Sequence, residues 1–402
     1  MRKALSLVAA ALMLTSLAAC GGGTSSSQPA ENPSGSSESA PAENSGTSEG
    51  GEILIGVITP QTGSVAIYGQ AVENGVRMAF EEINEAGGVA GKTFRLEVLD
   101  DKGDPIESTN AYNMLMDEEI DFLLGPVTSK PALAVMELAA EDGIPVLTAS
   151  ATQADVTSYG DNIFRTCFTD PFQGSVLANF TKNNLNLTKC AVLYNTSDDY
   201  SAGIANSFQN KAGELGLEVV SFEGYGATDK DFKTQLTNIQ SAGAEVLILP
   251  DYYQTAALVI AQAREIGLDI PVLGPDGFDG VLDVVNESDV AILNNVYFTG
   301  HYFTGDTDEK VANFVQSYTE KYNTSPVAFA ALGYDSAYII AEAYKATNGD
   351  TDFAAVVDAM KQTNYPGVAG NVKYGDNGDP IKSVSVIEIV DGAYQLSAKV
   401  EG

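Results

Sequence analysis

Short hydroxyl side chains follow two apolar, strand-like runs in the first half of the chain. In LLGPVTSKPALAV (residues 123–135), Thr128 and Ser129 stand where a helix is predicted to begin, and Ser150 and Thr152 follow the next apolar run, IPVLT. Hydroxyl groups beside helix amino termini suit an anion such as a carboxylate. Taken singly, these residues also fit structural roles, because Ser129 can cap a helix and the other two can form a turn.

Tyrosines and acids follow the apolar runs of the second half. Tyr200 ends VLYNTSDDY, Asp251 and Tyr252 follow VLILP, and Asp276 follows PVLGP. Aromatic faces and a carboxylate suit an ammonium group with an apolar neighbour. Taken alone, each tyrosine fits packing at a rim, and Asp276 in PDG fits an ordinary turn. Asp279, later in the same loop, is expected to be a solvated acid.

An alternation of short apolar strands with amphipathic helices must position these side chains. The strand at 53–58 is followed by a loop with Tyr68 and by the helix AVENGVRMAFEEINE, whose apolar residues recur at helical spacing. The alternation continues to about residue 150, and a second series begins near residue 173. This pattern predicts an α/β fold with two Rossmann-like lobes, each a parallel sheet covered by helices.

The same pattern predicts where a ligand binds. In open parallel sheets, ligands bind beyond the carboxyl ends of the strands, and every residue named above follows a strand. The hydroxyls of one lobe are therefore expected to face the tyrosines and the acid of the other. A cleft with these two walls fits a molecule that carries a carboxylate, an ammonium group and a modest side chain, which describes an α-amino acid.

Each lobe is predicted to combine two separate segments. The first lobe lacks helices for its second face, and the long helices late in the chain need a sheet to cover. We therefore expect lobe one to comprise residues 52–169 and 301–375, and lobe two to comprise residues 170–300 and 376–402. Several crossings between lobes make a hinge. A hairpin-like SVSVIEIVDGAYQLS is expected near the end, and helices after the first are predicted at 106–119, 131–142, 173–184, 202–215, 231–242, 254–266, 308–321, 327–346 and 352–362.

The amino terminus is predicted to carry an export signal and a lipid anchor. Residues 1–19 combine a basic start with a short apolar run, which is typical of a signal peptide. Leu17-Ala18-Ala19-Cys20 looks like a bacterial lipobox, which implies cleavage before Cys20 and its lipidation; the alternative is an ordinary signal peptide with an incidental cysteine. Residues 20–51 contain no large apolar side chain after Cys20 and are predicted to form a disordered tether.

Composition narrows the functional class. The formal net charge is −33, which argues against nucleic acid as a partner. His301 is the single histidine, no CxxC occurs, and so we expect no metal site and no cofactor. Cys167 and Cys190 lie in apolar surroundings, which favours two buried free thiols over a disulfide.

The folded part resembles the Leu/Ile/Val-binding proteins of bacterial ABC transporters, which have the type I periplasmic-binding fold. The motifs that carry the resemblance are GVITPQTGSVAIYGQAVENGVRMAFEEIN, GPVTS, SATQAD, DFKTQLTNIQSAGAEVLILPDYYQ, QAREIGL and GPDGFDG, in that order from residue 56 to residue 280. The resemblance extends over residues 53 to about 400. It implies a solute-binding lipoprotein that delivers an amino acid to a membrane permease.

The resemblance also implies roles for single residues. The family's carboxylate-binding Ser and Thr fall on Ser129 and Thr152, and Ser150 takes the position that offers its backbone. The acid that receives the ligand's ammonium falls on Asp276, where the best-known members have Glu, one methylene longer. The family's aromatic positions fall on Tyr68, Tyr200, Tyr252 and Phe329. Family members also bind amides, urea and aromatic acids, so the fold alone does not name the ligand.

The alternatives to a binding protein are an enzyme and the ligand-sensing domain of a receptor. An enzyme needs a nucleophile with its base, a metal cluster or a cofactor loop, and neither GxSxG, GxGxxG after the first strand nor a P-loop is present. A ligand-sensing domain of a receptor needs a membrane-spanning or signalling segment after the fold, and we expect none. The sequence therefore predicts a monomeric amino-acid-binding protein that is anchored to the cell membrane through Cys20 and faces the extracytoplasmic side.

Overall fold

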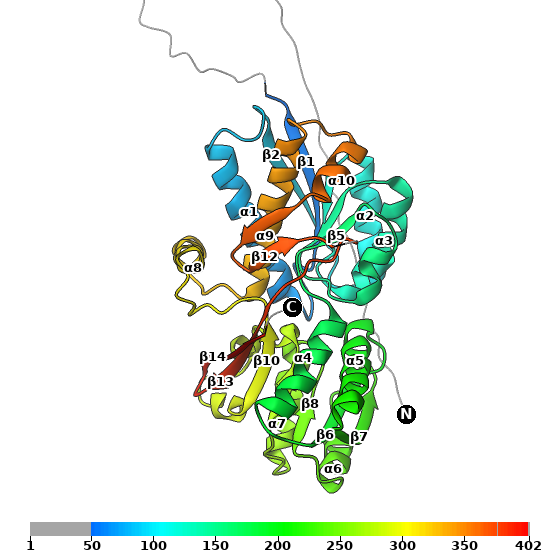
Figure 1. Ribbon diagram of the computed structural model, residues 1–402, viewed down its shortest axis with the longest axis vertical. Coiled ribbons are helices and arrows are strands. Elements are labelled where there is room, and N and C mark those ends of the chain that lie inside the picture. The colour runs from blue at the N-terminus through cyan, green and yellow to red at the C-terminus, as the bar shows by residue number, and fades with distance from the viewer. Residues whose placement is uncertain (1–49, 376, 401–402) are drawn as a thin grey trace, which may run out of the picture. The chain divides into compact units, whose positions relative to one another are not determined.

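The computed structural model describes residues 50–375 and 377–400 (Figure 1). The predicted signal peptide and Cys20 lie outside these residues, as does most of the predicted tether. Two main sheets organise the described part of the chain, and helices cover them. The predicted α/β fold with parallel sheets is confirmed.

The first sheet has five parallel strands in the order β2-β1-β3-β4-β5. Its core strands are apolar because both faces are covered, and every residue of β1 after the first is buried. Three helices, α1 to α3, connect its strands. The bounds are β1 (Glu52–Thr59), α1 (Ala66–Glu85), β2 (Thr93–Asp100), α2 (Pro105–Asp117), β3 (Phe122–Leu124), α3 (Ser129–Asp142), β4 (Val146–Thr148) and β5 (Ile163–Arg165).

The second sheet has seven strands in the order β14-β13-β10-β9-β8-β6-β7. Strands β6 to β10 are parallel to one another. The predicted hairpin, β13–β14, adds two antiparallel strands beside β10. The bounds are α4 (Asp170–Asn183), β6 (Lys189–Asn195), α5 (Asp199–Leu215), β7 (Glu218–Tyr225), α6 (Lys233–Ser241), β8 (Val246–Ile248), α7 (Tyr253–Glu265), β9 (Val272–Gly274), β10 (Val296–Gly300), β13 (Val384–Val390) and β14 (Ala393–Val400).

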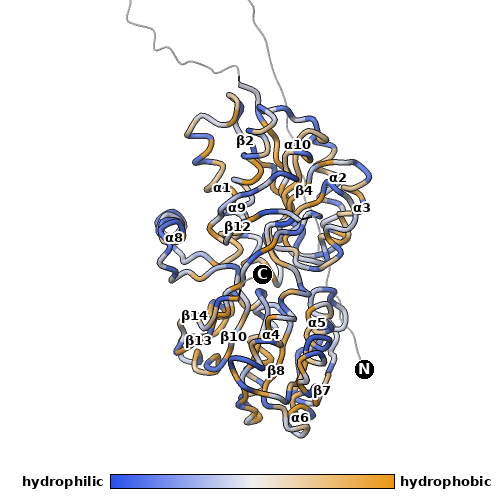
Figure 2. Tube along the Cα trace, viewed as in Figure 1, coloured by the Kyte–Doolittle hydropathy of each residue, from blue (hydrophilic) through white to orange (hydrophobic). Residues whose placement is uncertain are grey.

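Three late helices follow β10: α8 (Glu309–Tyr322), α9 (Ala328–Ala346) and α10 (Phe353–Met360). Helix α9 packs against α1, and two glycines permit their close approach. A Cβ at Gly75 would lie 2.1 Å from the carbonyl oxygen of Ala330, and one at Gly333 would lie 2.4 Å from that of Val72. Figure 2 shows α8 as largely hydrophilic, whereas the strands of both sheets are rich in hydrophobic residues.

Several elements are absent from the sequence-based prediction. Strand β5 and the separate hairpin of β11 (Asn364–Gly367) and β12 (Gly370–Lys373) were not expected, nor were short 3-10 helices such as Asp276–Phe278. The residue boundaries of the two predicted lobes stay a prediction. Cys167 and Cys190 are buried free thiols, as their apolar sequence surroundings indicated. Within the described residues, no helix is both long and apolar enough to cross a membrane.

Candidate functional site

Two loops at the carboxyl ends of β3 and β4 bring the predicted hydroxyls together. Ser129 Oγ accepts the backbone N–H of Gln153 at 3.2 Å, and Ser150 Oγ donates to the carbonyl of Val127 at 2.8 Å. Each bond joins one loop to the other. Thr152 is 1% exposed, and its Oγ1 has no hydrogen-bond partner in the described part of the chain.

Ser129 does not cap the helix that it begins. Thr128 occupies the N-cap position of α3 and its side chain makes no capping hydrogen bond, while Ser129 is the first helical residue. The capping interpretation of Ser129 is therefore wrong. Ser129 and the first backbone N–H groups of α3 lie together at the start of the helix. This end of the helix is therefore still suited to bind an anion.

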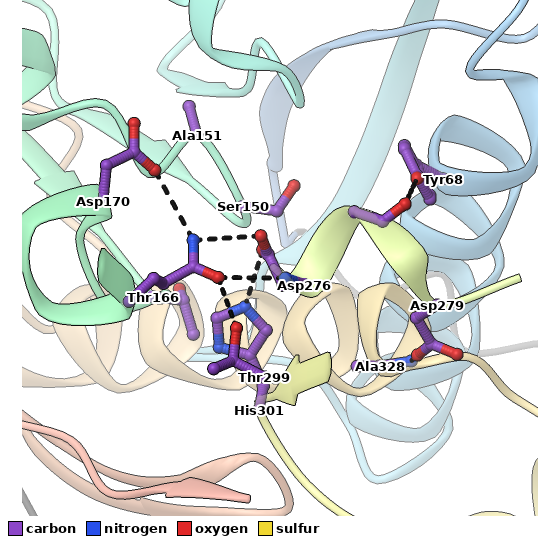
Figure 3. A network of polar contacts seen from close by, with 12 residues as sticks. Tyr68, Ser150, Ala151, Thr166, Asp170, Asp276, Asp279, Thr299, His301 and Ala328 are labelled. Atoms are coloured by element: carbon purple, nitrogen blue, oxygen red, sulfur yellow. Dashed lines mark hydrogen bonds and ion pairs between the residues drawn. The ribbon is translucent and has the colours of Figure 1, made fainter. Parts of the chain in front are cut away.

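Asp276 is the centre of a buried polar network rather than a turn acid (Figure 3). It is 2% exposed, and its Oδ1 accepts from the hydroxyl of Tyr200 at 2.7 Å and from Nε2 of Gln173 at 3.0 Å. Its Oδ2 lies 3.1 Å from Nε2 of His301. Gln173 Oε1 in turn accepts from the backbone N–H of Asp276 and from the hydroxyl of Thr299. The ordinary-turn interpretation is wrong.

His301 and Gln173 are site residues that the sequence analysis missed. His301 is buried and stacks on Phe168, with 3.8 Å between ring centroids and 18° between ring planes. Burial lowers the pKa of His301, and its contact with Asp276 acts in the opposite direction. His301 directly follows β10, so its position after a strand could have identified it as a site residue. Gln173 lies in the first turn of α4, and no sequence pattern identified it.

The four predicted aromatic residues form one cluster. Tyr68 stacks on Phe329 with centroids 4.0 Å apart, and Tyr200 stacks on Tyr252 at 4.8 Å with nearly parallel planes. Tyr68 and Tyr252 join the two pairs at 5.9 Å. The hydroxyl of Tyr68 donates to the carbonyl of Gly277 at 2.5 Å, so the first helix reaches the loop after β9. This cluster supplies an apolar wall beside Asp276.

Asp279 corrects an expectation of the sequence analysis. It is 5% exposed rather than solvated, and its Oδ2 accepts the backbone N–H of Ala328 at 2.6 Å. Burial raises the pKa of Asp279 to about 7. This carboxyl therefore connects the loop after β9 to the first turn of α9.

A cavity of about 450 Å³ opens beside the aromatic cluster. Tyr252 lines it, together with residues of loops and helices that follow strands of both sheets, among them Thr128, Lys130, Asp198 and Asp251. Asp251 is 4% exposed, and its Oδ2 has no hydrogen-bond partner among the residues that the structure describes. Burial raises the pKa of Asp251 to about 8. The volume lies in the range of small-molecule sites.

Comparison with known proteins agrees with this geometry. A family model for periplasmic binding proteins matches residues 52–393. The Leu/Ile/Val-binding protein homolog 3 of Brucella melitensis is 30% identical over 82% of this chain and 88% of its own length.

Two solved structures resemble the protein at 31% identity. The leucine binding protein LivK of Thermotoga maritima superimposes with a TM-score of 0.81 over 87% of this chain and 99% of its own. LivJ of Streptococcus pneumoniae, a branched-chain amino acid transporter substrate-binding protein solved in complex with isoleucine, gives a TM-score of 0.80 over the same shares. The family match over most of the chain, the shared fold and the strand-end site lead to one conclusion: the chain belongs to the periplasmic binding protein family.

Proposed function

We propose that this protein captures an α-amino acid with an apolar side chain and delivers it to an ABC permease. The observation that supports the proposal is the buried carboxyl of Asp276, which accepts from Tyr200 of the aromatic cluster and from Gln173. A buried carboxyl group favours a cationic, hydrogen-bond-donating partner. The ligand's ammonium is that partner, and the hydroxyls and the α3 amino terminus receive its carboxylate.

Residue roles follow from this placement. Ser129, Thr152 and the backbone at Ser150 hold the carboxylate end, and Asp276 holds the ammonium. The rings of Tyr68, Tyr200, Tyr252 and Phe329 surround the side chain. Amides, urea and aromatic acids lack an ammonium group, which makes them weaker candidates. The ligands named for the related LivK and LivJ, leucine and isoleucine, carry all three features.

Binding without chemical conversion is part of the proposal. The Asp276–His301 pair has the elements of an acid–base unit, but His301 Nδ1 contacts no nucleophile among the described residues. Burial raises the pKa of the nearby thiol of Cys167 to about 12, which disfavours the reactive thiolate. The ligand is therefore expected to be recovered unchanged.

Calorimetric titration with the twenty proteinogenic amino acids tests the ligand class. Leucine, isoleucine or valine is expected to bind in the micromolar range or tighter, and mass spectrometry after incubation should show the same molecule. Saturable binding of an amide or aromatic acid, with no amino acid bound, would replace the proposal. Formation of a product would sink the binding-protein assignment.

Anchoring through Cys20 is also proposed, on the pattern LAAC alone. Changing Cys20 to Ser in the full chain should release the processed protein from the membrane fraction of its host, because the thiol that carries the lipid is gone. Signal cleavage is checked by mass spectrometry of the amino terminus. A processed Cys20→Ser protein that stayed in the membrane would contradict the lipobox.

A further inference from the structure

His301 is the single histidine of the chain, and the proposed function gives it no role. It follows β10, its side chain is fully buried, and its ring stacks on Phe168 with 3.8 Å between the centroids. Nε2 lies 3.1 Å from Oδ2 of Asp276, while Tyr200 and Gln173 donate to Oδ1 (Figure 3). The acid that is proposed to receive the ligand's ammonium group therefore has a titratable neighbour.

The surroundings of the ring disfavour a positive charge on it. Both nitrogens of a charged imidazole are donors, whereas a neutral ring donates from one nitrogen and carries a lone pair on the other. Nδ1 of His301 is buried and has no hydrogen-bond partner among the residues that the structure describes. A proton on Nδ1 would create a buried N–H without an acceptor, which costs free energy. A neutral ring with its proton on Nε2 avoids this cost and still donates to Asp276.

Lys382 is a buried cation in the same part of the fold. It is 5% exposed, and its Nζ donates at 2.9 Å to the carbonyl of Thr166, in the segment that leads into α4. Burial lowers the pKa of Lys382 to about 8, so the amine is still mostly charged in neutral solution. Burial also lowers the pKa of His301, the charge of Lys382 acts in the same direction, and the contact with Asp276 opposes both.

The charge of Lys382 is supported from another element. Asp335 and Cys167 are the other titratable groups near its amine. Asp335 belongs to α9, is fully buried and favours the charged form of Lys382. Each of its two carboxyl oxygens accepts a backbone N–H at 2.7 Å, which holds this acid in place. The positive charge that acts on His301 is therefore part of the fold.

We propose that His301 is a positioning residue: it stays neutral before a ligand binds and donates from Nε2 to Asp276, so that the charge of Asp276 remains available to the ligand's ammonium group. A charged His301 would itself compensate this carboxyl and would repel the ammonium group. A proton on Nδ1 and the ligand therefore compete for one acid. The inference rests on the proposed function and adds regulation by pH, because acid then favours release of the ligand.

Nuclear magnetic resonance of the isotope-labelled ring tests its charge directly, because the chain has one histidine when it is purified without a histidine tag. Nitrogen chemical shifts distinguish the charged ring from each of the two neutral tautomers. In the ligand-free protein at about pH 7, a neutral ring with its proton on Nε2 is expected. A charged ring, or a neutral ring with its proton on Nδ1, would overturn the inference.

Lys382→Met tests the part played by the neighbouring cation. The substitution removes the charge and keeps most of the side chain's volume, so the titration midpoint of His301 should rise by at least about half a pH unit. Lys382→Gln is compared in the same way if Lys382→Met does not fold. A midpoint no higher than that of the wild type would contradict the inference.

Lys92→Met is the matched control. Lys92 Nζ also donates to a backbone carbonyl, that of Gly349 at 2.8 Å. It directly precedes β2 and so lies at the opposite end of that strand from the site. Its replacement should leave the titration midpoint of His301 unchanged.

Calorimetry with L-leucine tests whether the ring's proton competes with the ligand. Affinity is measured at about pH 7.5 and at about one pH unit below the His301 midpoint, where full competition predicts a loss of about tenfold and we expect at least about threefold. If the wild type unfolds at the lower pH, Lys382→Met is used, because its midpoint is higher. His301→Gln keeps a donor for Asp276 and cannot take up the proton, so its affinity should change less than about twofold between the same pH values.

The inference and the proposed function fail on different results. Equal pH dependence of leucine affinity in the wild type and in His301→Gln overturns the inference. Leucine binding by a protein whose His301 is charged in neutral solution also overturns it and leaves the proposed function standing. A wild-type protein that binds no amino acid at either pH defeats the proposed function and with it the competition, even if the ring proves neutral.

Discussion

At the scale of single residues, position after a strand was the informative signal. Asp276, Tyr200 and Tyr252 follow apolar runs, and the structure brings them into one cluster. The same rule would have found His301, which was set aside because the sequence shows no second histidine. Gln173 was out of reach, since its amide contacts with Asp276 and Thr299 connect it to residues more than a hundred positions further along the chain.

Tyr200→Phe tests how the Asp276 carboxylate is held. The Tyr200 hydroxyl donates to Asp276 and accepts from the backbone N–H of Gly277 at 2.9 Å. The substitution removes one hydrogen-bond donor to Asp276 and leaves the buried N–H of Gly277 unpaired. The expected free-energy cost is roughly 1–3 kcal/mol. Leucine binding measured by calorimetry should weaken about 5- to 100-fold.

A second tyrosine–aspartate pair, in which the tyrosine is buried and the carboxyl is exposed, supplies the control. Tyr112 donates to Asp142 at 2.6 Å between α2 and α3, outside the candidate site. Tyr112→Phe should lower the melting temperature and leave leucine affinity unchanged. Equal affinity losses in the two variants would show that Tyr200 acts only through global stability.

At the scale of elements, long periodic segments were predictable and short ones were not. All nine later helices listed from the pattern have counterparts, because each buries an apolar stripe that the sequence displays. Strand β5 has three residues, and its pairing with β4 depends on a tertiary neighbour. The contact of α9 with α1 depends on Gly75 and Gly333, whose role appears only when two distant helices meet.

Gly75→Ala tests that contact. Its new Cβ would lie 2.1 Å from a backbone oxygen of α9, so the helices must separate, and a loss of several kcal/mol in the free energy of unfolding is expected. Gly213→Ala in α5 is the control, because no atom lies within 4 Å of its Cβ. That change should stabilise by about 0.5–1 kcal/mol. Chemical denaturation compares the variants, and similar stabilities would contradict the close packing.

Asp279 predicts a pH effect at the loop that meets α9. Its folded pKa of about 7 lies above the ordinary value for an aspartate, so the folded protein holds this proton more tightly than the unfolded chain. The stabilising effect is complete below the ordinary pKa, near 4, and is lost as pH rises to about 7. Asp279→Asn removes this titration and keeps an acceptor for the N–H of Ala328.

Urea unfolding at several pH values measures the difference between wild type and Asp279→Asn. The stability of the wild type relative to the variant should fall between about pH 4 and pH 7, by up to a few kcal/mol, and then level off. A difference that does not change with pH would mean that Asp279 has an ordinary pKa. A rising difference would reverse the sign of the burial effect.

At the scale of the whole molecule, loops that follow strands of both sheets carry the candidate binding residues. The alternating pattern predicted the parallel sheets, and the resemblance predicted the residues at their carboxyl ends. What the sequence could not supply was the set of contacts that Gln173, Tyr200 and His301 make with the carboxyl of Asp276. The proposed function puts the ligand's ammonium at this acid and so predicts that capture of an amino acid depends on its charge.

The most direct test of this account is calorimetric titration of L-leucine into wild-type protein and into Asp276→Ala. Removing one partner of a buried charge pair costs roughly 2–5 kcal/mol, which corresponds to a loss of about 30- to several-thousand-fold in affinity. Asp121→Asn is the control and should bind like the wild type, because Asp121 accepts the backbone N–H of Leu54 near the start of β1, at the opposite end of the strand from the site. Near-complete loss of leucine binding by Asp276→Ala alone is the predicted result. Binding by Asp276→Ala within threefold of wild type would contradict the account, because the ammonium would then be held by another group.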